Sequence, residues 1–342
     1  MTNRERFHAV MNFEPFDRLP LIEWASWWNQ TLDRWFGEGL PRGKQADIFR
    51  YFGLDDHRQD WFRSLHYSAP PPAHHGAGLI SNEDDYEAFK PYLYPLDDDW
   101  PVQREKWQRW AQAQARGETI IWITLEGFFW FPRTLFGIEP HLYAFYDQPD
   151  LMHRINRENA EWMLKILDRV CEYCVPDFMT FAEDMSYNHG AMLSKDLFDE
   201  FMRPYYDMVV PALRERGIHT IIDSDGDVTV PIDWFAEAGL EGVLPLERQA
   251  GVDLAAIRRK QPHMRFIGHF DKMVMHLGED AMRREFERLL PVAAQGGFIP
   301  SCDHQTPPAV SLEDYKLYIA LFREYAAEAG RLSQSLKQSV TR

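Results

Sequence analysis

Acidic and histidine side chains follow most of the short apolar runs in this chain. The two richest groups are Asp223-Ser224-Asp225-Gly226-Asp227 and Cys302-Asp303-His304. Single groups follow the other runs, at Glu23, Glu126, Glu183, Asp184, Glu247, His269 and Asp271. Carboxylates and imidazoles can hold a divalent metal or move a proton. These positions are therefore the candidate reactive groups, although acids after strands also serve as N-caps of the helices that follow.

These groups need a scaffold that brings the ends of several strands together. Apolar runs that we expect to be strands alternate with longer amphipathic segments, at 119–125, 177–182, 220–222, 242–246, 265–268 and 297–300, and 19–24 repeats the theme. This alternation is typical of βα units and a parallel sheet. An open doubly wound sheet normally carries a glycine-rich phosphate turn, and no such motif occurs. We therefore expect an α/β fold, a (β/α)₈ TIM barrel with an elaborated N-terminal region, whose strand ends share one bowl.

Local signals predict where several helices begin. Thr2 with Glu5 has the capping-box pattern, and Ser194, Asp253 and Ser311 are expected N-caps. The helices expected after the last three are 195–202, 254–260 and 312–327, and the apolar spacing over 149–174 predicts a longer one. The Pro-rich segment 68–78 and the acidic segment 82–101 are expected to form an elaborate connection, a possible lid over a pocket.

Composition excludes several classes of function. The 342 residues carry 37 Lys plus Arg against 53 Asp plus Glu, a net charge of −16, so nucleic-acid binding is not expected. Three cysteines make no disulfide framework. No apolar stretch is long enough to span a membrane, and the N-terminus lacks a signal or transit pattern, so we expect a cytoplasmic protein. Some of the 12 Trp, 14 Tyr and 23 Phe are expected to line a pocket.

The segments 222–227 and 297–308, together with 3–6 and 16–20, resemble the uroporphyrinogen decarboxylase superfamily. Shorter matches occur in the same order at 182–185, 193–195, 201–205 and 265–271, so the resemblance runs from the first residues to about Arg323. It implies a (β/α)₈ barrel. We expect one such domain over 1–330, followed by a C-terminal tail over 331–342. The superfamily also contains the corrinoid-linked methyltransferases, among them the O-demethylase type.

The N-terminal region separates the branches of this superfamily. True uroporphyrinogen decarboxylases carry Arg-Gln-Ala-Gly-Arg, whose arginines hold the porphyrinogen carboxylates. Here the corresponding residues run from Ile22 to Trp28 and include Glu23 and Trp27. Because Glu23 would repel a carboxylate, haem biosynthesis is not expected. His304 lies where that family has a histidine near the active site, so a decarboxylase acting on another acid stays open.

The coenzyme M type methyltransferases imply a metal site. Their zinc ligands correspond to Asp223, Asp225 and His304 in this sequence, and Cys302 or Glu183 would complete the set. This set is harder than thiolates and would suit Zn²⁺ first, or Mn²⁺ or Fe²⁺. Two plainer interpretations stay open: Asp223 and Asp225 could stabilise a turn, and His304 could bond a backbone carbonyl.

The sequence therefore predicts a metal-dependent methyltransferase of the O-demethylase type. It would move a one-carbon unit from a small neutral or cationic substrate to a thiol or to a separate corrinoid protein, with no covalently bound cofactor; a homodimer is possible. Expected catalytic residues are Asp225, His304 and Glu183, and expected metal ligands are Asp223, Asp225, His304 and Cys302. The residues expected to bind substrate are Glu23, Trp27, Glu126, Asp184, Tyr187, Glu247, His269 and Asp271. The alternatives are a cofactor-independent decarboxylase or lyase and a non-catalytic ligand-binding barrel.

Overall fold

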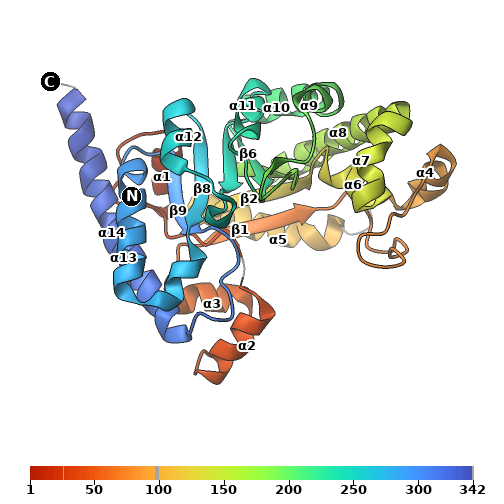
Figure 1. The fold of residues 1–342 in the computed structure, drawn as a ribbon. Coiled ribbons are helices and arrows are strands. Elements are labelled where there is room, and N and C mark those ends of the chain that lie inside the picture. The colour runs from red at the N-terminus through yellow and green to blue at the C-terminus, as the bar shows by residue number, and fades with distance from the viewer. Residues whose placement is uncertain (26, 97–99, 341–342) are drawn as a thin grey trace. The chain divides into compact units, whose positions relative to one another are not determined.

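The computed structural model describes residues 1–25, 27–96 and 100–340, in two compact units (Figure 1). The first unit comprises Met1–Arg58, Ala113–Ile120 and Val243–Arg342, and the second comprises Gln59–Gln112 and Ile121–Gly242. Each element is assigned below to the unit that holds most of its residues. In the described part of the chain, no helix is both long and apolar enough to cross a bilayer.

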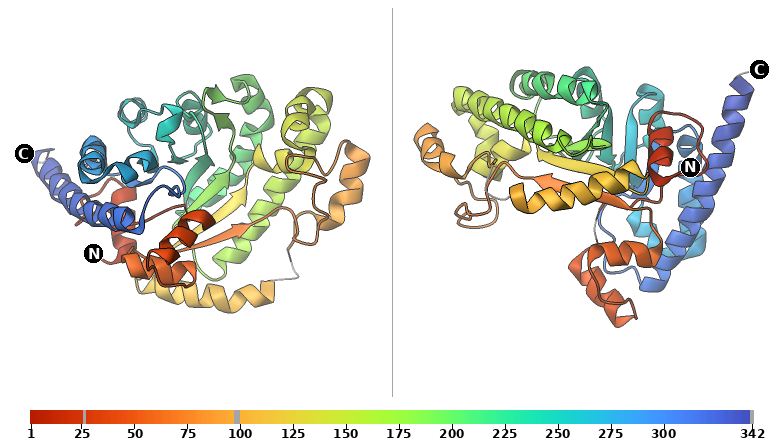
Figure 2. Two further views of the ribbon diagram at one scale, coloured as in Figure 1. Left: turned by 60° about the horizontal axis from the view of Figure 1, so that its bottom comes forward. Right: turned by 180° about the vertical axis from the view of Figure 1, so that it is seen from behind.

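The second unit contains a parallel sheet covered by helices. Its elements are β1 (His57–Phe62), α4 (Glu83–Phe89), η1 (Lys90–Tyr92), α5 (Trp100–Ala115), β2 (Ile120–Glu126), α6 (Trp130–Phe136), α7 (Ile138–Asp147), α8 (Pro149–Cys171), β3 (Phe178–Ala182), β4 (Ser186–Tyr187), β5 (Gly190–Ala191), α9 (Lys195–Phe201), α10 (Arg203–Glu215), β6 (His219–Ser224) and α11 (Pro231–Glu237). The strand order is β1-β2-β3-β6, with β2, β3 and β6 parallel. Strands β2 and β3 are buried along their whole length, as expected when both faces of a sheet are covered. Figure 2 shows α8 running beside α10, against which it packs.

The first unit contains a second set of strands and helices. Its elements are α1 (Asn3–Met11), α2 (Asn29–Gly37), α3 (Gln45–Phe52), β7 (Gly242–Pro245), η2 (Arg248–Ala250), α12 (Leu254–Lys260), β8 (Arg265–Phe270), η3 (Lys272–Leu277), α13 (Glu279–Ala293), β9 (Phe298–Cys302) and α14 (Leu312–Val340). Strand β8 lies between β7 and β9 and is parallel to β9, with Phe270 opposite Cys302. Helices α13 and α14 pack side by side (Figure 1). Both units therefore belong to an α/β fold.

Most of the predicted elements are confirmed. The six apolar runs from 119 to 300 coincide with β2, β3, β6, β7, β8 and β9. The side chains of Ser194, Asp253 and Ser311 accept hydrogen bonds from backbone N–H groups three residues on, and Thr2 forms the expected capping box. Closure of the strands into a (β/α)₈ barrel and a single domain over 1–330 stay predictions. Helix α14 runs through the predicted tail 331–342 to Val340, and the last two tail residues lie outside the described range.

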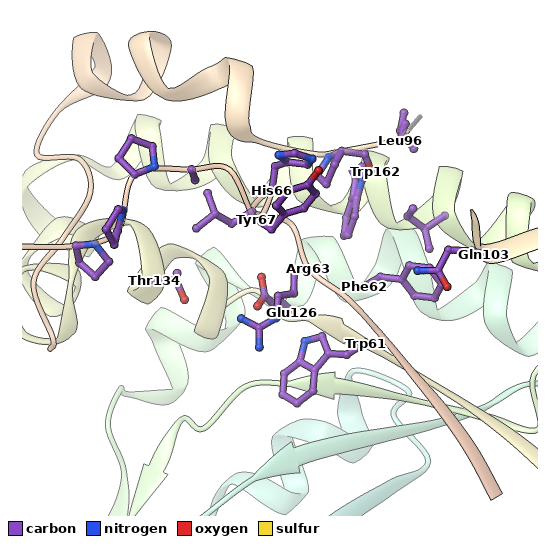
Figure 3. Close-up of a pocket in the computed structure, with 17 residues that line it drawn as sticks. Trp61, Phe62, Arg63, His66, Tyr67, Leu96, Gln103, Glu126, Thr134 and Trp162 are labelled. Atoms are coloured by element: carbon purple, nitrogen blue, oxygen red, sulfur yellow. Dashed lines mark hydrogen bonds between the residues drawn. The ribbon is translucent and has the colours of Figure 1, made fainter. Parts of the chain in front are cut away.

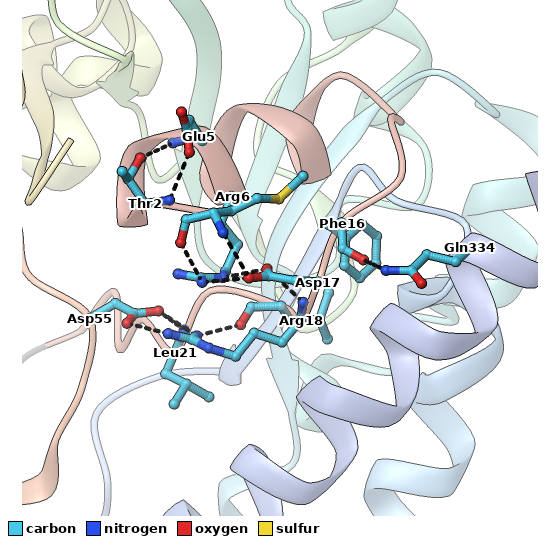
Figure 4. Close-up of polar contacts among 11 residues, drawn as sticks. Thr2, Glu5, Arg6, Phe16, Asp17, Arg18, Leu21, Asp55 and Gln334 are labelled. Atoms are coloured by element: carbon cyan, nitrogen blue, oxygen red, sulfur yellow. Dashed lines mark hydrogen bonds and ion pairs between the residues drawn. The ribbon is translucent and has the colours of Figure 1, made fainter.

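The N-terminal apolar run 19–24 is not a strand, and the reason lies in a polar network shown in Figure 4. Arg18 donates to both carboxylate oxygens of Asp55 at 2.7 Å, and Asp55 also accepts the backbone N–H of Leu21 at 2.9 Å. The backbone N–H of Leu19 donates to Ala326 of α14. Because these contacts use the backbone groups that a strand would offer its neighbours, the run is held without a ladder.

Candidate functional site

The strand register of the second unit brings several predicted residues to one edge of its sheet. Glu126 is opposite Ala182, and Ala182 is opposite Asp223. Because the three strands are parallel, their carboxyl ends share this edge. Glu183 and Asp184 follow β3 directly, and the backbone N–H of Glu183 donates to the carbonyl oxygen of Asp223 at 2.9 Å. The second unit therefore presents a row of carboxyl groups along one sheet edge.

Three of these carboxyl groups influence one another. Burial raises the pKa of Asp223 well above its usual value, and the negative charges of Asp184 and Asp225 raise it further. The backbone N–H of Asp225 donates to Asp184 at 3.2 Å. Gly226 has φ +84°, and a β-carbon there would lie 2.7 Å from the backbone of Tyr187. The hairpin of β4 and β5 thus packs against this turn, and Tyr187 is 49% exposed beside it.

Glu183 is buried and fully engaged by protein groups. Its carboxylate accepts the backbone N–H groups of Phe128, Phe129 and Trp130 at 2.8, 2.7 and 3.2 Å, and the hydroxyl of Tyr206 also donates to it. Burial raises the pKa of Glu183 to about 7, against the lowering effect of these donors. In this structure the carboxylate holds the chain that follows β2 and caps the start of α6. This arrangement favours a positioning role for Glu183.

Glu126 lies on a cavity of about 550 Å³ in the second unit (Figure 3). The backbone N–H of Ser64 donates to its carboxylate at 3.1 Å. Burial raises the pKa of Glu126 to about 7, although Ser64 and the nearby Arg63 lower it. The walls include Trp61, Phe62, Tyr67 and Trp162 and the proline run of the predicted lid segment. Pockets of this volume and apolar character hold small organic molecules.

Glu23 anchors a buried network in the first unit. Tyr318 donates to its carboxylate at 2.6 Å and Ser301 at 3.3 Å. Burial raises the pKa of Glu23 to about 7, despite these two hydrogen bonds. The neighbouring Trp24 donates from its indole nitrogen to the carbonyl of Cys302 at 2.6 Å, and its ring lies edge-on to His304, with centroids 5.9 Å apart. The ring contact with Trp24 links His304, two residues after β9, to this network.

Trp27 and Cys302 lie inside the first unit. Trp27 is buried and its ring contacts four aromatic side chains, those of Trp35, Phe49, Phe52 and Tyr315. This surrounding gives Trp27 a core environment instead of a pocket wall. Burial raises the pKa of the Cys302 thiol well above its usual value, and the nearby Glu23 and Asp303 carboxyl groups add to the effect.

The remaining predicted substrate residues of the first unit make contacts within it. The ring of His269 is buried, with Nδ1 2.7 Å from the carbonyl of Leu246 and Nε2 3.1 Å from the guanidinium of Arg288. Burial, with Arg288 nearby, lowers the pKa of His269 to about 4, so the ring is neutral. Asp271 caps η3 through the N–H of Met273 at 2.8 Å.

Glu247 belongs to a charged group that sequence reasoning did not assemble. Lys272 lies 3.8 Å from Glu247 and 3.2 Å from the buried Asp303. Asp303 also accepts the backbone N–H of Arg248 at 3.0 Å. The group ties the segment after β7 to the segments after β8 and β9.

The donor groups fit a divalent metal unequally. Mutual repulsion of Asp184, Asp223 and Asp225 would fall if a cation neutralised them. Cys302 does not fit, because a metal ligand must be a thiolate and its surroundings favour the thiol. Within residues 1–25, 27–96 and 100–340, no three or more His, Cys, Asp and Glu side chains form a metal-binding group. Asp223 and Asp225 belong to the second unit and His304 to the first, so their predicted grouping stays a prediction.

A sequence profile described as uroporphyrinogen decarboxylase (URO-D) matches residues 133–325, more than half of the chain. The chain belongs to the URO-D family. A comparison with curated proteins finds no match. This URO-D family member shares its fold with a methyltransferase from Methanosarcina mazei, at 15% identity and a TM-score of 0.66, over 95% of this chain and 99% of that one.

Two more distant structures are methionine synthases. A B12-independent methionine synthase from a Shewanella species is 11% identical, with a TM-score of 0.40 over 69% of this chain and 67% of that one. A putative vitamin-B12 independent methionine synthase from Listeria monocytogenes is 10% identical, with a TM-score of 0.42 over 94% and 98%. At these scores neither structure carries an argument about this chain.

Sequence reasoning missed the residues that line the cavity with Glu126. Trp61 and Phe62 end β1, and Arg63 and His66 follow it. Strand β1 reads His-Arg-Gln-Asp-Trp-Phe, too polar to be found as an apolar run. One signal could have indicated the cavity: the aromatic pair Trp61-Phe62 precedes Arg63 and lies close in sequence to the Pro-rich segment that was expected to form a lid.

Proposed function

We propose that this URO-D family protein is a methyltransferase that moves a one-carbon unit from a small substrate to a corrinoid protein or a thiol. The observation that carries the proposal is the crowding of Asp184, Asp223 and Asp225 at the carboxyl edge of the second unit's sheet. We expect these neighbouring carboxyl groups to attract a cation at the strand ends, where α/β enzymes place their chemistry. The shared fold with the Methanosarcina mazei methyltransferase supports the same reaction type.

In the proposed reaction the carboxyl groups hold a metal and the aromatic residues shield the substrate from water. Asp223 and Asp225 would hold a divalent metal, and when bound the metal would supply polarisation of the leaving heteroatom. Glu183 keeps the segment after β2 in place, so that Glu126 faces the cavity. The aromatic wall of the cavity excludes water from a bound substrate. A closed (β/α)₈ barrel, the finer form of this α/β fold, is part of the proposal.

A second candidate is decarboxylation without a cofactor, and Glu126 favours it. A carboxyl group that lines a cavity and has a pKa of about 7 can hold or release a proton at neutral pH. Loss of carbon dioxide leaves a carbanion, which such a group can protonate.

One pair of assays separates the two reactions. The purified chain is mixed with methylcobalamin and a thiol, and loss of the methyl–cobalt bond is followed by absorbance. Methyl transfer predicts thioether and free cobalamin, above the rate without protein. Carbon dioxide release from a panel of small carboxylic acids, with no corrinoid added, would instead support the decarboxylase. A protein inactive in both assays would contradict the decarboxylase and methyl transfer to a thiol, and would favour a ligand-binding barrel.

A further inference from the structure

The cavity beside Glu126 combines an apolar body with few polar groups. Trp162 and Ile166 of α8 form a buried part of its wall, whereas Trp61 and Tyr67 are 42% and 79% exposed. Figure 3 shows Arg63 next to Glu126, with His66 and Tyr67 on the side of Trp162. The polar groups at such a place decide which ligand is accepted, because the apolar walls accept many.

His66 offers a hydrogen-bond donor to this cavity. Its Nδ1 accepts the backbone N–H of Ser68 at 3.2 Å and lies 2.6 Å from the hydroxyl of the same residue. Because Nδ1 is an acceptor, the neutral imidazole carries its hydrogen on Nε2. The Nε2 atom is buried and has no hydrogen-bond partner among the described residues. A buried donor without an acceptor is costly, and a ligand acceptor would relieve that cost.

Arg63 supplies positive charge at the same cavity. Its guanidinium lies over the ring of Trp61, 5.8 Å from the centroid. It forms no salt bridge within residues 1–25, 27–96 and 100–340. The Glu126 carboxyl group lies near enough for the charge of Arg63 to lower its pKa. An arginine braced on an aromatic ring can still offer paired N–H donors to a ligand carboxylate.

Glu126 decides between an anionic and a cationic ligand. An ammonium ligand would gain only this carboxylate, and it would face the Nε2–H of His66 and the charge of Arg63. A carboxylate ligand would gain both donors. Glu126 can be protonated when such a ligand binds, because burial already raises the pKa of Glu126 to about 7. The protonated group then donates instead of repelling.

We propose that this cavity is a binding site for a small carboxylate with a flat apolar body. The ligand's carboxylate would contact Arg63 and the Nε2–H of His66, and its body would lie between Trp61, Tyr67 and Trp162. The proposed ligand would be the substrate of the proposed function, so this inference rests on that function in its choice of the Glu126 cavity. Binding itself can be measured without methyl transfer.

Binding of three probes to the full chain, measured by calorimetry, tests which charge the ligand carries. The probes share a phenyl group and differ in their polar end. These are phenylacetate, 2-phenylethanol and 2-phenylethylammonium, with acetate as the control for the charge alone. We expect phenylacetate to bind about tenfold more tightly than each of the other three. Tighter binding of the ammonium probe, or no binding of phenylacetate at millimolar concentration, would overturn the proposal. The methylcobalamin assay is separate, so a failure of methyl transfer leaves this result readable.

Two variants test the assigned contacts. Arg63→Gln should weaken phenylacetate about tenfold and leave 2-phenylethanol unchanged. Arg109→Gln is the matched control, because Arg109 is an exposed arginine of α5 that does not line the cavity. Glu126→Gln should retain phenylacetate, since an amide still donates. Loss of phenylacetate binding in Glu126→Gln, or its retention in a folded Arg63→Gln, would overturn the assignment.

Discussion

The carboxyl group of Glu183 occupies the space that a side chain at Gly127 would need. A β-carbon on Gly127 would lie 2.1 Å from the carboxyl carbon of Glu183. The absence of a side chain lets the segment after β2 close over this carboxylate and donate three backbone N–H groups to it. The glycine after Glu126 is therefore explained by a residue 56 positions further along the chain.

Gly127→Ala should destabilise the protein strongly. The added methyl group must push Glu183 away from its backbone donors, and a displaced buried carboxylate costs about 3 kcal/mol. Gly37→Ala is the matched control, because a β-carbon there meets no atom within 4 Å, and we expect it to change stability by less than about 1 kcal/mol. Urea unfolding of both variants checks the prediction; equal effects of the two substitutions would contradict it.

Stability should depend on pH through Glu23. Burial raises the pKa of Glu23 to about 7 from an ordinary value of 4.5, so the folded protein binds this proton more tightly than the unfolded chain. Stability is therefore highest below pH 4.5 and is lost as the pH rises through 7, by about 3 kcal/mol for this group. Glu23→Gln removes the ionisation and leaves Tyr318 an acceptor. The free energy of unfolding is measured for both proteins at pH 5 and pH 8. Relative to the wild type, the variant should be more stable at pH 8 than at pH 5. An identical difference at both pH values would sink the assignment.

Asp55→Ala should loosen the N-terminal segment of the first unit. Asp55 is largely buried, pairs with Arg18 through two hydrogen bonds and accepts the backbone N–H of Leu21. Its loss leaves a half-buried guanidinium and a backbone donor unpaired, at a cost of about 3 kcal/mol. Asp47→Ala removes an exposed pair with Arg50 and the hydrogen bond from the backbone N–H of Lys44 at the start of α3, and should cost only about 1 kcal/mol. Thermal unfolding that ranks the two variants equally would contradict this account of Figure 4.

Elements that depend on local or continuous signals could be predicted from the sequence. The run that became β2 is buried at every position, and Ser194 and Asp253 cap their helices through bonds three residues away. Strand β1 was not predicted because only His57 is buried, and its other residues alternate between partly buried and exposed positions. The apolar run 19–24 was wrongly predicted to be a strand, because its backbone partners, Asp55 and Ala326, lie far along the chain.

The candidate site was predictable in part for the same reason. The alternation of strands and helices in the sequence predicts that carboxyl groups gather at the strand ends of the second unit. The sequence could not tell which of them are free to act, because that depends on distant donors. Glu183 is held by the segment after β2, and Glu126 is turned to a cavity built by residues after β1.

The most direct test of the proposed reactive group compares Asp225→Asn with Asp168→Asn in the methylcobalamin and thiol assay. Asp168 is an exposed carboxylate of α8, in the same unit and paired with Arg216, so its substitution controls for the loss of one charge. We expect Asp225→Asn to lower the rate about a hundredfold, and Asp168→Asn to stay within about twofold of the wild type. Equal rates in the wild type and a folded Asp225→Asn variant would contradict this expectation.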